Sequence, residues 1–278
     1  MKVLDAQAIE DIALGAALLG TGGGGDPYIG KLMALQAVKK YGPVSMISID
    51  EVPDDAFIVP TAMMGAPTVL IEKIANGCEF KRVFEAMEKY MGKKIFATMP
   101  IEAGGVNSMI PLAVAAQMGV PIIDGDGMGR AFPELQMVTY HLHGVTSSPM
   151  AITDEKGNMS VLETISNKWS ENLARSLTVT QGGSVMIGIY PMTGKQVKKS
   201  AIRDIVTFSE EIGKSIRESS KYDIPPVKQL LEKINGYELF RGKIVDVLRE
   251  TKAGFNFGTV KIDGIENYKG ETCEVNFQ

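Results

Sequence analysis

The first half of the chain combines two patterns of apolar residues. Apolar side chains that recur every three to four residues, as on one face of a helix, predict helices at 9–19, 28–42, 79–92 and 109–119. Short continuous apolar runs between them predict buried β-strands at 44–49, 56–65, 94–100 and 120–127. This alternation predicts an α/β fold whose mixed, partly parallel sheet is flanked by helices.

The second half of the chain has a different pattern. Helical spacing returns over 160–177 and 199–219, and from Tyr237 onward β-forming residues alternate with turn residues. We therefore predict an N-terminal α/β domain at 1–167 and a C-terminal α+β, β-rich domain at 168–278. The sequence stops on the strand-like run CEVNFQ, so we expect this second module to be truncated.

Composition and charge exclude several classes of protein. The 278 residues are 45% hydrophobic and 22% charged, which is ordinary for a globular chain, and the net charge is -4. An acidic balance gives no reason to expect nucleic-acid or membrane binding, and no apolar stretch is long enough to span a membrane. Cys78 and Cys273 lie far apart without a CxxC motif, which argues against a disulfide framework and favours a cytoplasmic location.

The run LGTGGGGDPYIG, from Leu19 to Gly30, invites comparison with nucleotide-binding loops. Residues GDPYIGK match the G-x-x-x-x-G-K spacing of a P-loop, but Leu32 stands where a Ser or Thr would bind magnesium. A predicted helix, not a strand, leads into the run, which also rules out the dinucleotide-binding fingerprint. We therefore expect no nucleotide cofactor.

Two interpretations of the glycine run remain. Its backbone can line a small-molecule pocket, because amides ahead of a helix bind anions or polarised carbonyl oxygens. It can also allow a tight crossing between helices, because glycine has no Cβ. Asp26 is expected to cap the helix that begins at Pro27. The first interpretation predicts substrate-binding residues at Gly22, Gly23, Gly24, Gly25 and Asp26.

Carboxylates gather in the run DGDGMGRAFPE. Asp124 and Asp126 are two residues apart and would point the same way on an extended segment. Two such carboxylates can hold a hard cation or divide the roles of general acid and base. The alternative is a solvated Asp-Gly turn. We take Asp124 and Asp126 as catalytic candidates, and the nearby Arg130 and Glu134 as substrate-binding candidates.

The only histidines in the sequence, His141 and His143, also lie two residues apart, on a predicted strand over 137–145. This spacing can place two imidazoles on one metal, so Asp126, His141 and His143 form a candidate site for a divalent ion, zinc or manganese. A TIM-barrel amidohydrolase would need further histidines, which the sequence lacks. The alternative is two ordinary surface or core histidines.

Two further predicted strands lead into polar loops. Glu102 and Asn107 flank a Gly-Gly pair after the strand at 94–100. Glu102 is a catalytic candidate, and Asn107 either caps the next helix or binds substrate. Thr68, in the turn after 56–65, can donate a hydrogen bond to a ligand. Parallel strands present such loops at their carboxyl edge, where ligands gather.

Four motifs appear along the chain in the order LGTGGGGDP, MMGAPTVLIEK, EAGGVNSMIPL and DGDGMGRAFPELQM. This order resembles the S-methyl-thiohydantoin desulfurase family, which is often found beside hydantoinase-type genes. The resemblance is close from Ala8 to Met150 and continues more loosely into ETKAGFNFGTVKIDG, which looks like the family's second domain. It implies a two-domain α/β-plus-β protein.

The resemblance also implies hydrolytic chemistry on a five-membered cyclic amide or thioimidate. Water would replace methanethiol on an S-methyl-thiohydantoin and leave a hydantoin. Such a reaction needs an activated water and groups that stabilise charge on the ring. We therefore expect a hydrolase with a small-molecule substrate. The alternative is a non-catalytic binding subunit of a hydantoinase-type partner, and a homo-oligomer is also expected.

Overall fold

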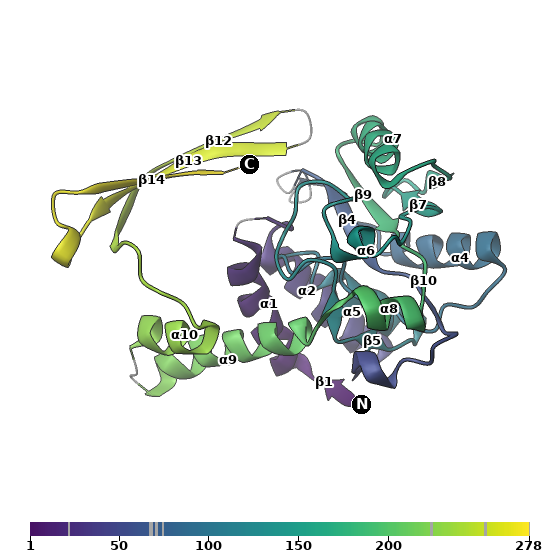
Figure 1. Cartoon of the computed structure of the whole chain (residues 1–278), viewed down its shortest axis with the longest axis horizontal. Coiled ribbons are helices and arrows are strands. Elements are labelled where there is room, and N and C mark those ends of the chain that lie inside the picture. The colour runs from purple at the N-terminus through teal and green to yellow at the C-terminus, as the bar shows by residue number, and fades with distance from the viewer. Residues whose placement is uncertain are drawn as a thin grey trace. The chain divides into compact units, whose positions relative to one another are not determined.

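The computed structural model describes residues 1–21, 23–66, 69, 72–73, 75–222, 225–252 and 255–277. The chain divides into two compact units, which we call unit 1 (Met1–Lys214) and unit 2 (Ser215–Gln278). Unit 1 combines helices with parallel and antiparallel strands, and unit 2 is rich in β-structure (Figure 1). This arrangement confirms the predicted fold class. The predicted domain boundary after residue 167 lies earlier than the division between the units.

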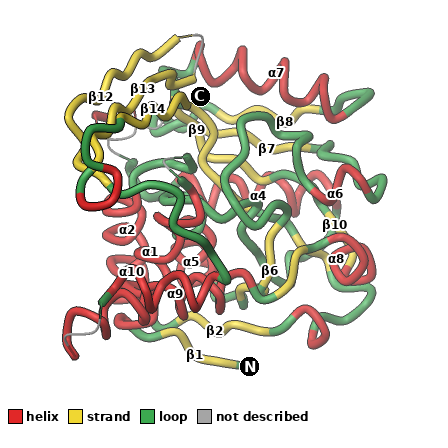
Figure 2. Tube along the Cα trace, turned by 60° about the vertical axis from the view of Figure 1, so that its left-hand side comes forward, coloured by secondary structure: helices red, strands yellow, loops and turns green. Residues whose placement is uncertain are grey.

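One part of unit 1 packs three helices beside a small sheet (Figures 1 and 2). Its elements are β1 (Lys2–Leu4), α1 (Ala6–Gly20), α2 (Pro27–Tyr41), β2 (Val44–Ile47), α5 (Ile110–Met118) and β5 (Ile122–Ile123). The sheet order is β1-β2-β5, with β2 antiparallel to β1 and parallel to β5. The helical spacing that predicted α1 places Ile9 and Ile12 in the core with Leu112 of α5.

The other part of unit 1 is a four-stranded antiparallel sheet between two helices. Its elements are β4 (Thr61–Gly65), α4 (Glu79–Met91), β7 (Met150–Thr153), β8 (Met159–Leu162), α7 (Asn167–Thr180) and β9 (Ser184–Gly188), in the strand order β4-β9-β7-β8. Met186 of β9 packs in the core with Phe84 of α4, whereas Val185 and Ile187 pack in the core with Ala174 of α7. Alternate side chains of one strand therefore face opposite helices.

Short elements join these two parts. They are η1 (Ile49–Glu51), β3 (Phe57–Ile58), β6 (Gly125–Asp126), α6 (Thr139–Leu142), β10 (Met192–Thr193), α8 (Gly194–Ser200) and β11 (Ile202–Arg203). The 18-residue helix α9 (Ile205–Tyr222) follows them and continues past Lys214, the last residue of unit 1. β3 pairs with β10, and β6 pairs with β11, both antiparallel. The second pair fixes the segment that carries Asp126 against the segment that leads into α9.

Several predicted elements take another form. The predicted strand at 94–100 contributes isolated parallel bridges, not a continuous strand, and the predicted strand at 137–145 contains the helix α6. The predicted helix at 160–177 begins at Asn167, because residues 159–162 pair with β7 as strand β8. Pairing with distant segments decided the structure at 94–100 and 159–162, and periodicity along one segment does not report such pairing.

Unit 2 contains α10 (Pro226–Ile234), β12 (Gly242–Lys252), β13 (Phe255–Gly264), η2 (Glu266–Tyr268) and β14 (Thr272–Phe277). The three strands form an antiparallel sheet in chain order. Their register aligns Val247, Val260 and Val275 across the sheet, so one face is apolar.

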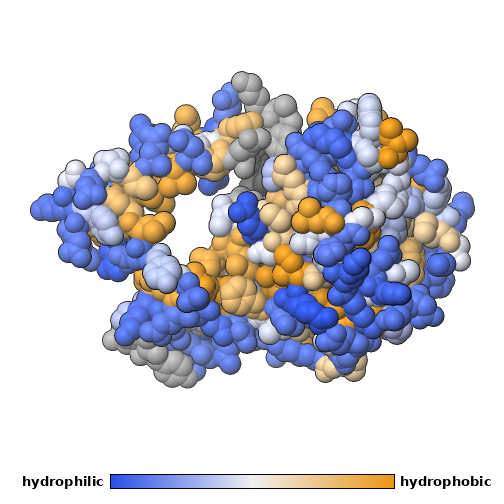
Figure 3. Space-filling view, in the orientation of Figure 1, coloured by the Kyte–Doolittle hydropathy of each residue, from blue (hydrophilic) through white to orange (hydrophobic). Residues whose placement is uncertain are grey.

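The surface of unit 1 visible in Figure 3 is largely hydrophilic, with isolated apolar patches. No helix in the described part of the chain combines the length and hydrophobicity of a membrane span.

Candidate functional site

Three loops of unit 1 meet at a place that we call the three-loop junction: residues 23–25, 102–107 and 126–132. The Gly24 carbonyl accepts hydrogen bonds from the Val106 N–H at 2.7 Å and from the Asn107 N–H at 3.1 Å. A Cβ added to Gly23 would lie 2.6 Å from the Ala131 Cβ. The glycine run and the DGDGMGR segment, about a hundred residues apart in the sequence, are therefore neighbours in the fold.

Glycine is required where the first two loops touch. A Cβ on Gly105 would lie 2.0 Å from the Gly25 carbonyl oxygen, and a Cβ on Gly24 would lie 2.6 Å from the Gly104 Cα. The space beside the described glycines of the run is thus filled by other parts of the protein: backbone at Gly24, and the side chains of Ala131 and Val106 at Gly23 and Gly25. This favours the tight-crossing interpretation, although the run crosses a loop and not a helix.

Asp26 caps α2, as predicted. Its Oδ1 accepts hydrogen bonds from the Tyr28 N–H at 2.7 Å and the Ile29 N–H at 3.4 Å. Gly22 and Thr68, two predicted substrate-binding residues, lie outside the described residues.

Glu102 is buried at the junction, with 4% of its surface exposed. Its Oε1 accepts a hydrogen bond from Asn107 Nδ2 at 2.5 Å, and its Oε2 accepts one from the Phe132 N–H at 2.7 Å. Asn107 is fixed by the Met63 backbone, since its Oδ1 accepts from the Met63 N–H at 2.8 Å. Asn107 therefore orients Glu102 and does not cap α5, whose N-cap residue is Met109. Burial raises the pKa of the Glu102 carboxyl to about 7.

Asp126 is completely buried. Its Oδ1 accepts hydrogen bonds from the Met128 N–H at 3.1 Å and the Gly129 N–H at 2.8 Å, and its Oδ2 accepts a second one from Gly129 at 3.0 Å. Burial raises the pKa of the Asp126 carboxyl to about 7, and the charge of Glu102 adds to this rise.

Glu102 and Asp126 thus form a coupled pair of buried carboxyls from two different loops. The charge of Glu102 is one cause of the raised pKa of Asp126, and with both pKa values at about 7 each carboxyl is partly protonated near neutral pH. Such a pair contains a proton donor and a proton acceptor in one place. The segment from Met128 to Phe132 covers both carboxyls, since its amides donate to both.

The structure places the carboxylates of Asp124 and Asp126 in separate hydrogen-bond networks, and their catalytic roles stay predictions. Asp124 Oδ1 accepts hydrogen bonds from the Val206 N–H at 2.9 Å and the Thr207 N–H at 3.1 Å, and its Oδ2 accepts one from Thr207 Oγ1 at 2.5 Å. Asp124 therefore satisfies the N-terminal amides of α9. It lies between β5 and β6, whereas Asp126 is the last residue of β6.

Replacing Asp124 by Ala removes the acceptor for the first amides of α9. We expect the free energy of unfolding to fall by about 1–2 kcal/mol, the usual effect of losing a helix cap. Urea unfolding followed by circular dichroism measures this change. A variant as stable as the wild type would contradict the capping role.

The coupled pair also predicts how stability depends on pH. The pKa values of Glu102 and Asp126 rise from ordinary values of 4.5 and 3.8 to about 7 on folding. The folded state then binds more protons than the unfolded state between about pH 4 and pH 7, so stability falls as pH rises through this window.

We expect the free energy of unfolding to be about 5 kcal/mol lower at pH 8 than at pH 5, since each of the two groups contributes about 2.5 kcal/mol. Urea titrations at both pH values, repeated on the Glu102→Gln/Asp126→Asn double variant, isolate their contribution. An unchanged pH dependence in the double variant would contradict the shifted pKa values.

Two family models together match nearly the whole chain. The N-terminal domain of S-Me-THD-like proteins matches residues 7–164, and the C-terminal domain matches residues 165–278. The chain belongs to the S-Me-THD-like family. This confirms the resemblance to the S-methyl-thiohydantoin desulfurase family that the four motifs carried.

A solved structure shows the same fold as this S-Me-THD-like protein. It is the X-ray crystal structure of a protein from Chromobacterium violaceum, with a TM-score of 0.77 and 21% sequence identity. The alignment covers 100% of this chain and 76% of that chain. No curated protein matches the chain.

The remaining substrate-binding candidates of this S-Me-THD-like chain lie at or near the surface. Arg130 is exposed and belongs to the segment that covers the two carboxyls. Glu134 is partly exposed and forms an ion pair with Lys168. The Lys168 ammonium keeps the pKa of the Glu134 carboxyl below its usual value. Arg130 therefore belongs to the three-loop junction, whereas Glu134 is paired with Lys168.

The structure does not bring the predicted metal ligands together. His141 and His143 are exposed at α6, and His141 Nδ1 lies 2.9 Å from Asn167 Nδ2. In the parts of the chain that the structure describes, no three or more His, Cys, Asp or Glu side chains are grouped to hold a metal ion. Asp126, His141 and His143 are thus not assembled, and a zinc or manganese ion stays a prediction.

Sequence reasoning missed the groups that surround Asp126. Tyr140 is fully buried, and a Cβ on Gly127 would lie 2.8 Å from its ring. Burial raises the pKa of the Tyr140 hydroxyl, and the charge of Asp126 raises it further. The Met128 and Gly129 amides that donate to Asp126 carry no side-chain signal, so a sequence pattern cannot identify them. The glycines of DGDGMGR were the available signal that backbone approaches closely here.

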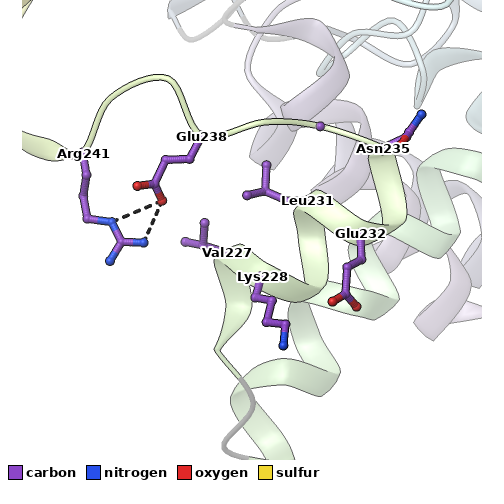
Figure 4. A pocket seen from close by; sticks show the side chains of 8 residues that line it. Val227, Lys228, Leu231, Glu232, Asn235, Glu238 and Arg241 are labelled. Carbon is purple, nitrogen blue, oxygen red and sulfur yellow. Dashed lines mark hydrogen bonds and ion pairs between the residues drawn. The ribbon is translucent and has the colours of Figure 1, made fainter. Parts of the chain in front are cut away.

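Unit 2 contains a separate open pocket of about 390 Å³. Val227 and Leu231 project from α10 towards the segment that carries Glu238 and Arg241 (Figure 4). Arg241 Nη2 donates to a Glu238 carboxylate oxygen at 2.7 Å. The volume falls within the range of small-molecule sites.

Proposed function

We propose that this protein is a hydrolase-type enzyme acting on a small cyclic amide or thioimidate, such as an S-methyl-thiohydantoin or a hydantoin-like ring. The observation that carries the proposal is the coupled, buried carboxyl pair of Glu102 and Asp126, whose pKa values are both raised to about 7. A pair with pKa values near neutral can supply a base and an acid at the same pH. Membership of the S-Me-THD-like family supports the choice of substrate class.

The proposed reaction needs both members of the pair. The ionised carboxylate accepts a proton from water as the water oxygen bonds to the ring carbon of the C=N–S group. The tetrahedral intermediate then expels the sulfur, and the protonated carboxyl supplies a proton to the departing methanethiolate. The products are a hydantoin and methanethiol, and the pair ends with one proton, as it began.

Access to the pair requires movement of the segment from Met128 to Phe132. Both carboxyls are buried beneath it, so a substrate reaches them only when its amides release Asp126 and Glu102. Arg130 lies on this segment and can hold a ring carbonyl once the substrate is bound. Asn107 stays bonded to Met63 during this movement and keeps Glu102 in place.

A substrate panel tests the proposal. The purified protein is incubated with S-methyl-thiohydantoins, hydantoins and oxoproline, and methanethiol release and ring products are measured. We expect methanethiol from at least one thiohydantoin, at a rate that the Glu102→Gln variant loses. Elemental analysis of the same preparation for zinc and manganese tests the predicted metal.

The second candidate is a non-catalytic binding subunit that works with a hydantoinase-type enzyme. The pocket of about 390 Å³ in unit 2 favours it, because it can hold a small molecule without any buried acid-base pair in its lining. Calorimetry with the same panel distinguishes the two candidates. Ligand binding without turnover would favour the binding subunit if Leu231→Asp abolished that binding and Glu102→Gln did not.

A further inference from the structure

A small, partly open cavity lies in unit 1, away from the three-loop junction. The start of α4, the end of β7 and the start of β9 surround it, and its lining includes Lys73, Glu79, Asp154, Glu155 and Ser184. Its volume is about 20 Å³, which is room for one water molecule or one ion of similar size. The proposed hydrolase chemistry uses none of these residues.

Glu79 presents an unsatisfied oxygen at this cavity. The residue is 2% exposed, and its Oε1 accepts a hydrogen bond from the Asn76 N–H at 2.8 Å. Its Oε2 is buried without a hydrogen-bond partner among the described residues. A buried carboxylate oxygen without a partner is costly, so a ligand that satisfies it is favoured.

The other charged side chains of the cavity are already occupied. Lys73 Nζ lies 2.7 Å from Glu155 Oε2 and donates to the Ser184 carbonyl at 2.6 Å. Asp154 accepts hydrogen bonds from the Asn158 N–H at 2.8 Å and from Asn158 Nδ2 at 2.7 Å. Neither set of contacts supplies a hydrogen bond to Glu79 Oε2.

The lining therefore has an excess of negative charge. It contains three carboxylates, Glu79, Asp154 and Glu155, and one ammonium, Lys73. Glu79 is also the first residue of α4. A cation is the ligand that both satisfies the free oxygen and reduces the excess charge.

We propose that this cavity binds one monovalent cation of about the size of a water molecule, K⁺ or NH₄⁺, against Glu79 Oε2. A divalent ion would need several converging carboxylates, and the described residues contain no such group. The bound cation would link the first turn of α4 to the ends of β7 and β9. It would therefore stabilise unit 1 without taking part in the proposed reaction.

Thermal unfolding in matched salts tests the site. Unfolding temperatures are compared in KCl, NH₄Cl and choline chloride at equal ionic strength, because choline is too large for the cavity. We expect a saturable rise in K⁺ or NH₄⁺ that reaches roughly 5–10 °C when the cation is about a hundredfold above its dissociation constant. The two salts show which cation is bound. Equal unfolding temperatures in all three salts would mean that water fills the cavity, and would overturn the proposal.

The Glu79→Gln variant removes the charge while keeping the size of the side chain. We expect it to lose the cation-dependent rise, whereas Glu85→Gln, an exposed carboxyl on the same helix, keeps it. A rise that persists in Glu79→Gln would overturn the proposal. If Glu79→Gln does not fold, anomalous diffraction from wild-type crystals soaked in RbCl decides the question. A rubidium peak beside Glu79 supports the site, and its absence overturns it.

Discussion

Replacing Asp126 by Asn should lower the turnover of a thiohydantoin substrate by about 10²–10⁴-fold, the usual contribution of general acid-base catalysis. The amide of Asn cannot gain or lose a proton near neutral pH, so the pair loses one of its two roles. The Asn side-chain oxygen can still accept the hydrogen bonds that the Met128 and Gly129 amides donate to Asp126 Oδ1, and only the second contact of Gly129, to Oδ2, is lost. The variant should therefore fold, and a stopped assay of methanethiol release measures the loss.

Asp124→Asn is the matched control for this experiment. It makes the same chemical change two residues away, at a carboxylate that caps α9 and does not face Glu102. We expect turnover within about twofold of the wild type, with a small loss of stability. If both variants kept full turnover, Asp126 would have no part in the chemistry.

Replacing Gly105 by Ala should destabilise the protein by about 3 kcal/mol, the upper range for overpacking a well-filled site. The new Cβ would lie 2.0 Å from the Gly25 carbonyl oxygen and 2.9 Å from the Pro27 nitrogen. Both atoms are backbone, so no side-chain rotation relieves the collision. Two loops of the junction would have to move apart, which would also disturb Asn107 and its hydrogen bond to Glu102.

The Gly77→Ala variant separates the effect of this collision from that of backbone strain, which is the other cost of replacing a glycine. Gly77 has a φ of 84°, where a side chain is strained, but a Cβ there would meet no atom within 4 Å. We expect it to cost about 1 kcal/mol from backbone strain alone. Guanidinium unfolding of both variants gives the comparison. A loss in Gly105→Ala no larger than in Gly77→Ala would show that the loops do not pack as closely as described.

Sequence patterns predicted a helix or strand best where the residues within one segment determine its structure. Apolar spacing located α1, α2, α4 and α5, and the Asp26–Pro27 pair located the start of α2 correctly. The His141 segment misled because its short apolar spacing fits a strand as well as one helical turn. Such short runs contain too few residues to distinguish the repeat of a strand from the repeat of a helix.

The candidate site was harder to predict because its parts come from distant loops. Glu102 and Asp126 were both recognised as candidates, but spacing suggested Asp124 as the partner of Asp126. The true neighbour is set by how the loop from 102 to 107 crosses the glycine run, and no local pattern encodes that crossing. The raised pKa values depend on burial in the folded chain, which a sequence does not display.

The pH dependence of kcat/KM for methanethiol release tests the central claim most directly. If Glu102 and Asp126 act as base and acid, the profile is bell-shaped with its maximum near pH 7, and Asp126→Asn keeps only one limb of the bell. A wild-type rate that is constant from pH 5 to pH 9, or a bell that survives intact in Asp126→Asn, would contradict the assignment of the pair.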